Sequence, residues 1–429
     1  MKKYQTIILI FISILVSCKK DDGEVNLPST NTPNILLIIA DDLGKDAING
    51  YSEGSVKPNT PNLDDIRNNG ITFNNLWVYP TCSPTRASII TGKYGYRTNV
   101  KWAGDVLNNS ENILHNYIKT ETNNKYATAV IGKWHLAGDS NTTFNPENLG
   151  MDYYAGLLSG GGGYTQWNLT EDGNTTLESS YITEKFTDLS IDWINAQNKP
   201  WFLWLAYTAP HTPFHLPPNE MHSQGNLPEY STGMNPIPYY MAAIEAMDYQ
   251  IGRLLDDLTE EEKNNTIFIF IGDNGTPNQV AQAPYSSSTA KGSLFQGGIN
   301  TAMFVSGAGV SRTGNDENLI SGTDLYATVA EITGITVNTI NDSKSFTSLF
   351  SNNQNIRNYQ YSEKNDGTTD AWTISNGNYK LIVNSNSEEQ MYDLLNDPYE
   401  STDLLSGTLT TEQENSKLNL EVELNLIRN

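Results

Sequence analysis

The chain has 429 residues, which exceeds an average single domain and is enough to bury a sizeable core. Its 26 Lys and Arg residues against 49 Asp and Glu residues give a formal net charge of −23. This charge argues against nucleic acid or an anionic membrane surface as a partner, because both would be repelled. It would also repel a polyanion, so any anion site must be a local cluster of cations.

The first 17 residues have the pattern of a secretory signal, because Lys2 and Lys3 precede an apolar stretch too short to span a membrane. The sequence Leu-Val-Ser-Cys ending at Cys18 resembles a bacterial lipoprotein cleavage site. This resemblance implies an exported protein anchored at the outer membrane by lipid on Cys18, with palmitate expected, facing either the periplasm or the surface. The alternative is an ordinary cleaved signal. Residues 18–33 are expected to form a flexible tether.

Four apolar, β-branched runs end abruptly in polar residues. Such continuous runs are typical of strands buried on both faces, as in a parallel sheet covered by helices. In these folds ligands bind outside the carboxyl ends of the strands, so the polar residues there predict a functional site. The runs are 34–40, 126–131, 201–206 and 266–271, and the residues that follow them include Asp41, Asp42, Lys133, His135, His211, Asp273 and Asn274.

Helices are predicted between these strands. Thr60 and Pro61 match an N-cap and a first-turn proline, with Gly70 at the C-terminal end of the same helix. Residues 239–258 carry apolar side chains at helical spacing. The glycine run at residues 160–163 predicts a mobile loop near the substrate.

The character of the chain changes after about Thr336. Residues 372–383 predict a hairpin with an Asn-Gly turn, and a helix is expected over 411–427. The predicted fold class is α/β. A catalytic domain, residues 34–340, contains a large, mostly parallel sheet flanked by helices, and residues 341–429 form a small subdomain with an antiparallel sheet plus a helix.

The strongest local motif is Cys-Ser-Pro-Thr-Arg at residues 82–86, followed by Thr-Gly at 91–92. It matches the Cys-x-Pro-x-Arg signature, so the chain resembles the type I, formylglycine-dependent sulfatases of the alkaline-phosphatase-like superfamily. The resemblance implies that a separate formylglycine-generating enzyme oxidises Cys82 to 3-oxoalanine, whose hydrate is the nucleophile. With Cys18 lipidated, Cys82 is the lone cysteine, so a disulfide framework is excluded. A buried structural cysteine is the alternative.

Further residues match the metal ligands of that family. Asp41 and Asp42 match its paired acids after the first strand, and Asp273 and Asn274 match its later Asp-Asn pair. These four offer only oxygen ligands, which suit one Ca²⁺ per chain better than zinc. The resemblance adds the oxidised residue at Cys82 as a further ligand.

Three more segments resemble family motifs. Lys133 and His135 lie in a Gly-Lys-Trp-His segment, and His211 lies in a Pro-His-Thr-Pro segment. Lys291 matches the lysine of a Lys-x-x-x-x-Glu-Gly-Gly pattern, but Gln296 stands where the glutamate is expected.

The family resemblance also implies a role for each catalytic residue. Lys133 and Lys291 stabilise charge on the sulfate oxygens, and Arg86 orients the formylglycine and the metal site. His211 is the expected general acid for the leaving alcohol, and His135 is the expected base that deprotonates the second hydroxyl.

Aromatic residues near the expected mouth of the site could stack on sugar rings, although core packing is expected for at least half of them. They are Trp102, Tyr164, Trp167 and Tyr207. His215 could also touch substrate, with plain exposure as the alternative.

The resemblance implies hydrolysis of sulfate esters on a sulfated carbohydrate, with release of inorganic sulfate. Algal glycans such as ulvan, carrageenan or fucoidan are the leading candidates, ahead of animal glycosaminoglycans. One alternative is a phosphodiesterase or phosphonate monoester hydrolase with the same signature, against which the oxygen-ligand set argues. Another is an inactive carbohydrate-binding relative, against which the intact catalytic residues argue. No nucleic-acid partner is expected.

Overall fold

The computed structural model describes residues 32–138, 144–337 and 339–429. Ten strands form its largest sheet, in the spatial order given at the end of this paragraph. Their bounds are β1 Asn34–Ala40, β2 Gly70–Phe73, β4 Ala127–Lys133, β5 Tyr153–Leu157, β6 Trp167–Glu171, β7 Asn174–Glu178, β8 Trp201–Ala206, β9 Thr266–Gly272, β10 Met303–Gly307 and β11 Gly314–Asp316. The order is β11-β2-β10-β9-β1-β8-β4-β5-β6-β7, and the five strands from β9 to β5 run parallel.

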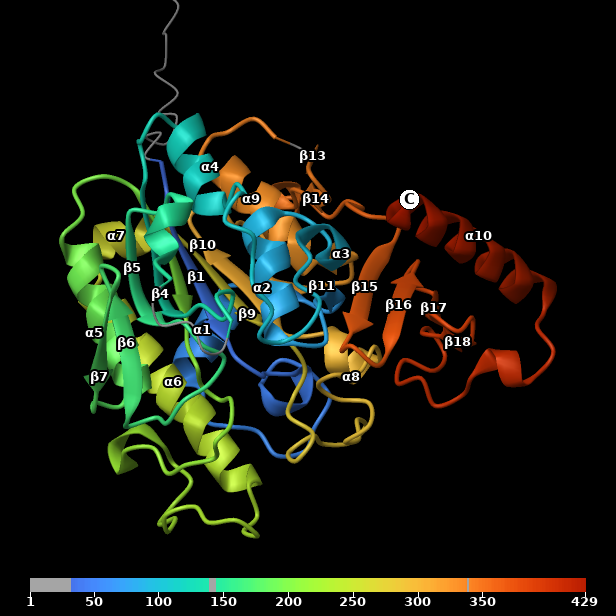
Figure 1. Ribbon diagram of the computed structural model, residues 1–429, viewed down its shortest axis with the longest axis horizontal. Coiled ribbons are helices and arrows are strands. Elements are labelled where there is room, and N and C mark those ends of the chain that lie inside the picture. The colour runs from blue at the N-terminus through green and yellow to red at the C-terminus, as the bar shows by residue number, and fades with distance from the viewer. Residues whose placement is uncertain (1–31, 139–143, 338) are drawn as a thin grey trace, which may run out of the picture. The chain divides into compact units, whose positions relative to one another are not determined.

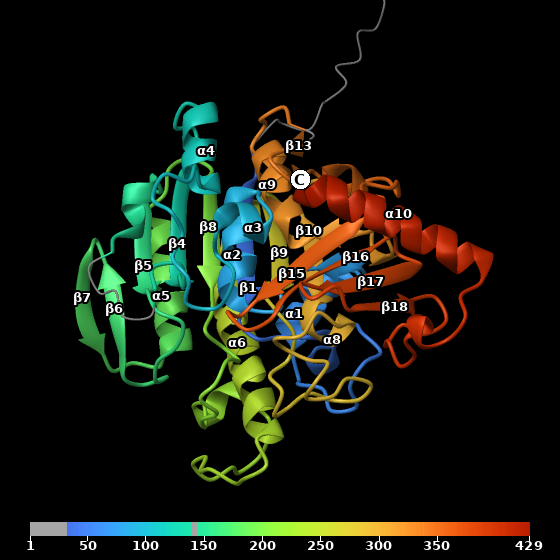
Figure 2. The ribbon, with the colours of Figure 1, turned by 45° about the vertical axis from the view of Figure 1, so that its right-hand side comes forward.

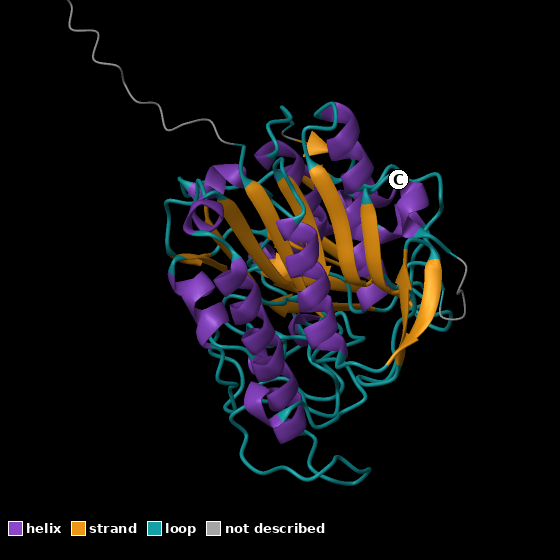
Figure 3. Cartoon of the chain, turned by 90° about the vertical axis from the view of Figure 1, so that its left-hand side faces the viewer, coloured by secondary structure: helices purple, strands orange, loops and turns teal. Residues whose placement is uncertain are grey.

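Helices cover both faces of this sheet (Figures 1 and 3). One face carries α2 (Cys82–Thr91), α4 (Leu114–Glu121) and α9 (Leu325–Ile332), and the other carries α1 (Pro61–Asn68), α5 (Ile182–Asn195) and α6 (Ile237–Asp257). Strand β1 shows why its apolar run is continuous. Ile35 and Leu37 pack into the core on the first face, whereas Leu36 and Ile38 pack into the core on the second.

A second, antiparallel sheet of four strands lies near the C-terminus, with α10 packed along it (Figure 2). Leu420 and Leu424 of α10 join Tyr361 and Leu381 of the sheet in one apolar cluster. The strands are β15 Gln360–Asn365, β16 Asp370–Ser375, β17 Tyr379–Asn384 and β18 Glu389–Asp393, and α10 spans Thr411–Arg428. The shorter elements are β3 Leu76–Trp77, β12 Ile320–Ser321, β13 Thr339–Ile340, β14 Ser343–Lys344, α3 Gly95–Thr98, α7 Glu260–Asn264 and α8 Gln296–Ile299.

The C-terminal sheet packs directly against α8 and the residues that precede it. Ile382 of β17 lies in one apolar cluster with Leu294 and Ile299. The buried Lys380 ammonium donates to the Leu294 carbonyl at 2.6 Å. Contacts therefore cross the expected boundary after residue 340, and the division into two domains stays a prediction.

The predicted fold class is confirmed. The four apolar runs are β1, β4, β8 and β9, and β4 continues as far as Lys133. The helix expected over residues 239–258 is α6, the expected hairpin is β16–β17, and the C-terminal helix is α10. These elements were predictable because their apolar spacing and turn residues act within a few positions along the chain.

One local assignment around α1 was wrong, whereas the N-cap position of Thr60 and the first-turn position of Pro61 are confirmed. Gly70 does not end the helix but begins β2, where a Cβ would lie 2.1 Å from the Val305 carbonyl oxygen of β10. Glycine is thus required by a neighbouring strand rather than by a helix end. Thr60 occupies the N-cap position, but its hydroxyl makes no capping bond and accepts from the Asn49 amide at 3.2 Å.

The expected signal segment, the lipid-bearing Cys18 and nearly all of the tether lie outside the described residues, and their assignments stay predictions. In the part of the chain that the structure describes, none of the helices is both long and apolar enough to cross a bilayer.

Candidate active site

Four neighbouring strands bring the predicted polar residues together. In the order β9-β1-β8-β4, all four strands are parallel, so their carboxyl ends meet at one edge. The residues that leave this edge are Asp41 and Asp42 after β1, Lys133 and His135 at the end of β4, His211 beyond β8, and Asp273 and Asn274 after β9.

Cys82 is the first residue of α2 and is fully buried among these groups. Its Sγ lies 3.1 Å from Nδ1 of His135 and 3.7 Å from the Lys133 ammonium. Burial raises the pKa of the Cys82 thiol to about 11, although Lys133 opposes the shift. The unmodified side chain is therefore a neutral thiol at neutral pH and a poor nucleophile.

Arg86, one turn further along α2, links two strand ends. Its guanidinium donates from Nε and Nη2 to Oδ2 of Asp273 at 3.0 and 2.8 Å. Nη1 donates to the carbonyl of Lys133 at 2.7 Å. Because Arg86 and Asp273 are both fully buried, this charge-assisted pair, with the bond to Lys133, ties the ends of β9 and β4 together.

The four predicted metal ligands lie side by side. The Asn274 amide donates to the Asp42 carboxylate at 2.8 Å, and the Asp42 backbone N–H donates to Asp273 at 3.0 Å. Ligand atoms of Asp41, Cys82 and Asp273 all lie within 4.8 Å of one another. Asp42 adopts a left-handed backbone with φ of 67°, which lets consecutive acids serve one site.

Two unpaired oxygens test whether this set fits a cation. Among the residues that the structure describes, Asp41 Oδ1 and Asn274 Oδ1 are buried without a hydrogen-bond partner. Burial and the neighbouring Asp41 also raise the pKa of Asp273, even though Arg86 opposes the shift. Buried oxygens without hydrogen-bond donors, next to further carboxylate oxygens, are what a hard divalent cation satisfies, so the residues fit one.

Two lysines add positive charge beside Cys82. The buried Lys133 ammonium donates to Asp41, and the Lys291 ammonium lies 2.6 Å from the Asp42 carboxylate. Burial alone would lower the pKa of Lys291, but the charge of Asp42 raises it above its usual value. Both side chains are therefore cations at neutral pH.

His135 is held tightly against the Cys82 thiol. Its backbone is left-handed, with φ of 55°, and a Cβ placed on Gly160 would come within 2.1 Å of its Nε2. Burial, reinforced by the charge of Lys133, lowers the pKa of His135 to about 2. The imidazole is therefore neutral at neutral pH, and its Nδ1 faces the Cys82 sulfur.

His211 faces the same acids from the loop after β8. Its Nδ1 lies 2.5 Å from the carbonyl of Thr212, so this nitrogen must be the donor, and Nε2 lies 3.7 Å from the Asp42 carboxylate. The Tyr164 hydroxyl donates to the His211 carbonyl at 2.7 Å. The loop is thus anchored so that Nε2 faces the site.

The structure separates the predicted aromatic residues. Trp102 lines the hollow in front of the site, whereas Trp167 packs on Phe186 in the core and the Tyr207 hydroxyl is bonded to Thr187. Tyr164 supports the His211 loop, and His215 stacks on Tyr164 with ring centroids 3.5 Å apart. Of the four aromatic residues, only Trp102 is placed to meet a sugar.

Sequence reasoning missed several supporting residues. The Ser83 hydroxyl donates to the His135 carbonyl at 2.8 Å, and the Tyr240 hydroxyl donates to the Asp42 carbonyl at 2.6 Å. Ser83 could have been predicted, because it directly follows Cys82 within the signature. Tyr240 could not, because in the sequence it resembles the other apolar residues on the buried face of its helix.

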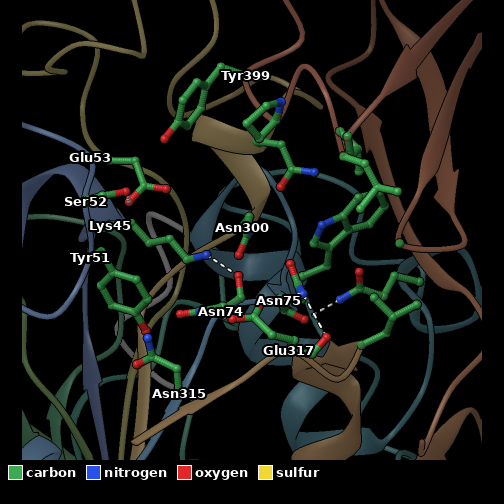
Figure 4. Close-up of a pocket in the computed structure, with 18 of the residues that line it drawn as sticks. Lys45, Tyr51, Ser52, Glu53, Asn74, Asn75, Asn300, Asn315, Glu317 and Tyr399 are labelled. Atoms are coloured by element: carbon green, nitrogen blue, oxygen red, sulfur yellow. Dashed lines mark hydrogen bonds between the residues drawn. The ribbon is translucent and has the colours of Figure 1, made fainter.

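Gln296, the departure from the family pattern, lies away from Cys82. It lines a separate hollow of about 470 Å³, shown in Figure 4, where Lys45, Asn300 and Glu317 also point inward. Its backbone N–H donates to Glu400 at 2.6 Å. None of the predicted catalytic residues or metal ligands lines this hollow, so the glutamine does not alter the charge around Cys82 directly.

Comparison with known proteins identifies the family. The model of the sulfatase family matches residues 33–335. The chain belongs to the sulfatase family. It is 28% identical over 366 residues to the uncharacterised sulfatase YdeN of Escherichia coli, covering 71% of this chain and 63% of that protein. It is 25% identical over 424 residues to the arylsulfatase of Klebsiella aerogenes, covering 74% and 90% of the two chains. The match to YdeN thus spans less than two thirds of that relative.

Solved sulfatase structures share the fold. Ps i-CgsB in complex with k-i-k-neocarrahexaose superposes with a TM-score of 0.77 at 24% identity, covering 92% of each chain. PsFucS1 from Pseudoalteromonas sp. superposes with a TM-score of 0.72 at 20% identity, covering 93% of this chain and 91% of that one. The alkaline-phosphatase-like fold expected from the signature is confirmed, while the role of each site residue stays a prediction.

Proposed function

We propose that this protein hydrolyses sulfate esters of a sulfated polysaccharide or its oligosaccharides and releases inorganic sulfate. The observation that carries the proposal is the meeting of Cys82 with two lysines and two histidines beside a set of oxygen ligands. Hydrolysis of a sulfate ester needs a strong nucleophile, cations beside the negatively charged sulfate oxygens and a proton for the leaving alcohol. This edge of the sheet offers a group for each requirement.

The proposed reaction also needs a Ca²⁺ ion and a formylglycine residue, two groups that the family resemblance implies. Asp41, Asp42, Asp273 and Asn274 would hold Ca²⁺, which supplies positive charge at the sulfate. Cys82 would be oxidised to formylglycine by a maturation enzyme, and the hydrate of that group would supply a nucleophilic hydroxyl and a second hydroxyl that can be deprotonated.

The chain's own cations orient the ester. The Lys133 ammonium lies 3.7 Å from Cys82 Sγ, and the Lys291 ammonium lies 2.6 Å from the Asp42 carboxylate, so both can bind sulfate oxygens. Charge that develops on those oxygens during attack is stabilised by fixed cations in a buried setting. Arg86 keeps the residue at position 82 and the acid set in place through its bonds to Asp273.

The two histidines handle protons at different atoms. Nδ1 of the neutral His135, 3.1 Å from the side chain at position 82, accepts a proton from that residue. His211 keeps one proton on Nδ1 for the Thr212 carbonyl and, when doubly protonated, donates from Nε2 to the leaving oxygen.

The substrate class rests on the neighbours and on the expected export. One neighbour was solved with a neocarrahexaose, and another with D-glucosamine-2-N,6-O-disulfate. With a lipid anchor at Cys18, the protein would act on glycans outside the cytoplasm. Algal polysaccharides such as ulvan, carrageenan or fucoidan are the proposed substrates, ahead of animal glycosaminoglycans.

The direct test measures inorganic sulfate released from a panel of sulfated oligosaccharides by protein co-expressed with a formylglycine-generating enzyme. Release that disappears in Cys82→Ala supports the proposal and names the substrate class. If peptide mass shows formylglycine at position 82 but no sulfate is released from any glycan, the proposal fails. Phosphodiesters and phosphonates are then the next substrates to assay.

A further inference from the structure

Two adjacent hollows lie in front of the candidate active site. The first, about 460 Å³, is lined by Asp42, Trp102 and Lys291 among others, and the second, about 370 Å³, runs over the C-terminal sheet as far as Gln390 of β18. Both hollows are lined by Lys291 and Lys364, together with Asn278 and Gly292. The two hollows are therefore neighbours, and together they are called the sheet groove; they extend from the acid set to the surface of the C-terminal sheet.

The sheet groove differs in charge from the rest of the chain. The second hollow is lined by Lys291 and Lys364 and, among the described residues around it, by no Asp or Glu. Its other polar groups are hydroxyls and amides, such as Asn384 and Gln390. In the first hollow the single acid is Asp42, which Lys291 neutralises. In a chain with a net charge of −23, a lining of two lysines and one acid is a local surface at which an anion can bind.

Lys364 is the cation furthest from the Cys82 set along the sheet groove. It lies on β15, and its ammonium is 5.3 Å from the centroid of the Trp102 ring. Asp366 lies 3.2 Å from the ammonium, but it does not line either hollow, and its other oxygen accepts from the backbone of Thr368 and Thr369. Because an ammonium has three N–H donors, Lys364 can pair with a ligand while it keeps its ion pair with Asp366.

Resting on the function proposed above, we infer that the sugar next to the sulfated sugar lies in the sheet groove and carries an anionic group bound by Lys364. A carboxylate or a second sulfate has the required chemistry. Trp102 lines the first hollow beside Lys364, where its side chain can contact the sugar. The groove thus makes the enzyme selective for a sulfate ester flanked by an acidic sugar.

The test measures binding separately from hydrolysis. Cys82→Ala protein is titrated with oligosaccharides in which the sulfated sugar is flanked by a uronic acid, by a second sulfated sugar or by a neutral sugar. We expect the acidic neighbours to bind about tenfold more tightly than the neutral one, the scale of one charge-assisted contact. Lys364→Met in the same background should remove that preference.

Lys263→Met is the matched control, because Lys263 also has an acidic neighbour, at 3.3 Å, but lines neither hollow. It should keep the preference. The uronic-acid and sulfated arms decide which anion is preferred. Equal binding of acidic and neutral neighbours, or a preference that survives Lys364→Met, overturns the inference even if the matured enzyme releases sulfate. Absence of sulfate release from every glycan overturns the proposed function instead.

Discussion

Gly160 leaves no room for a side chain beside His135, because an added Cβ would lie 2.1 Å from Nε2. Gly160→Ala should therefore push the imidazole away from position 82 and lower kcat by about 100-fold, the cost of a displacement of about 1 Å. Gly161→Ala is the control, since its Cβ would meet His211 only at 3.8 Å, an ordinary contact. Steady-state kinetics on the matured proteins would measure both effects, and equal activities would contradict the assigned role of His135.

His211 is predicted to matter in proportion to how poorly the alcohol leaves. His211→Ala should cost about 100-fold or more on an alkyl or sugar sulfate and less than about tenfold on a nitrophenyl sulfate, whose leaving group needs no proton. Lys291→Met should lower both rates by similar factors, because sulfate charge develops in either reaction. Equal losses for His211→Ala on the two ester classes would rule out general-acid catalysis by this residue.

At the scale of elements, α6 holds the first turn of α1 through one buried carboxylate. Asp248 accepts from the backbone N–H of Leu63 at 2.7 Å and of Asn62 at 3.2 Å. These are donors that a helix N-terminus leaves unpaired. Burial raises the pKa of Asp248 to about 6 despite these bonds. The link between the two helices is therefore sensitive to pH.

The folded-state pKa of Asp248 lies above the unfolded value of about 3.9. The unfolded chain therefore loses this proton first as pH rises, and the free energy of unfolding should fall by up to about 3 kcal/mol between about pH 4 and pH 6. Asp248→Asn removes the titration, so the decline should shrink by that amount. Denaturation curves of both proteins across this range measure the difference. Identical pH dependence in the two proteins would contradict the prediction.

The strand order decides which residues can share a site at the scale of the whole molecule. β9, β1, β8 and β4 bring together acids and cations from segments more than two hundred residues apart, such as Asp42 and Asn274. A ligand that binds only this assembled set stabilises the folded chain.

Ca²⁺ should therefore raise the melting temperature. At a concentration about 100 times its Kd, we expect a rise of about 2–4 °C, and a smaller one with Mg²⁺. Chelation should reverse the rise. Asn274→Ala removes one of the two unpaired buried oxygens of the candidate metal site. It should reduce the rise in melting temperature that Ca²⁺ causes. A rise of the same size in this variant would argue that the ion binds elsewhere.

Much of the fold and of the candidate site was predictable because the signals are local. The run at β1 is apolar on both faces, so a parallel, covered strand follows from its side chains alone. The signature around Cys82 and the Gly-Lys-Trp-His segment are each only a few residues long. Such motifs identify candidate functional residues without any knowledge of where these residues lie in the fold. The sequence by itself thus determined the fold class, the family resemblance and most of the candidate residues.

Only the tertiary structure decided which other residues support the candidate site residues. Gly70 and Gly160 are glycines because another segment approaches each of them closely. The residues next to them in the sequence do not predict either approach. Trp167 and Trp102 look alike in the sequence, but one packs in the core and the other lines the hollow. Gln296, which departs from the family pattern, lines a separate hollow, whereas Lys364, which no sequence motif singled out, lines the hollow in front of the site. Contacts between distant segments depend on strand pairing and packing, which local patterns do not encode.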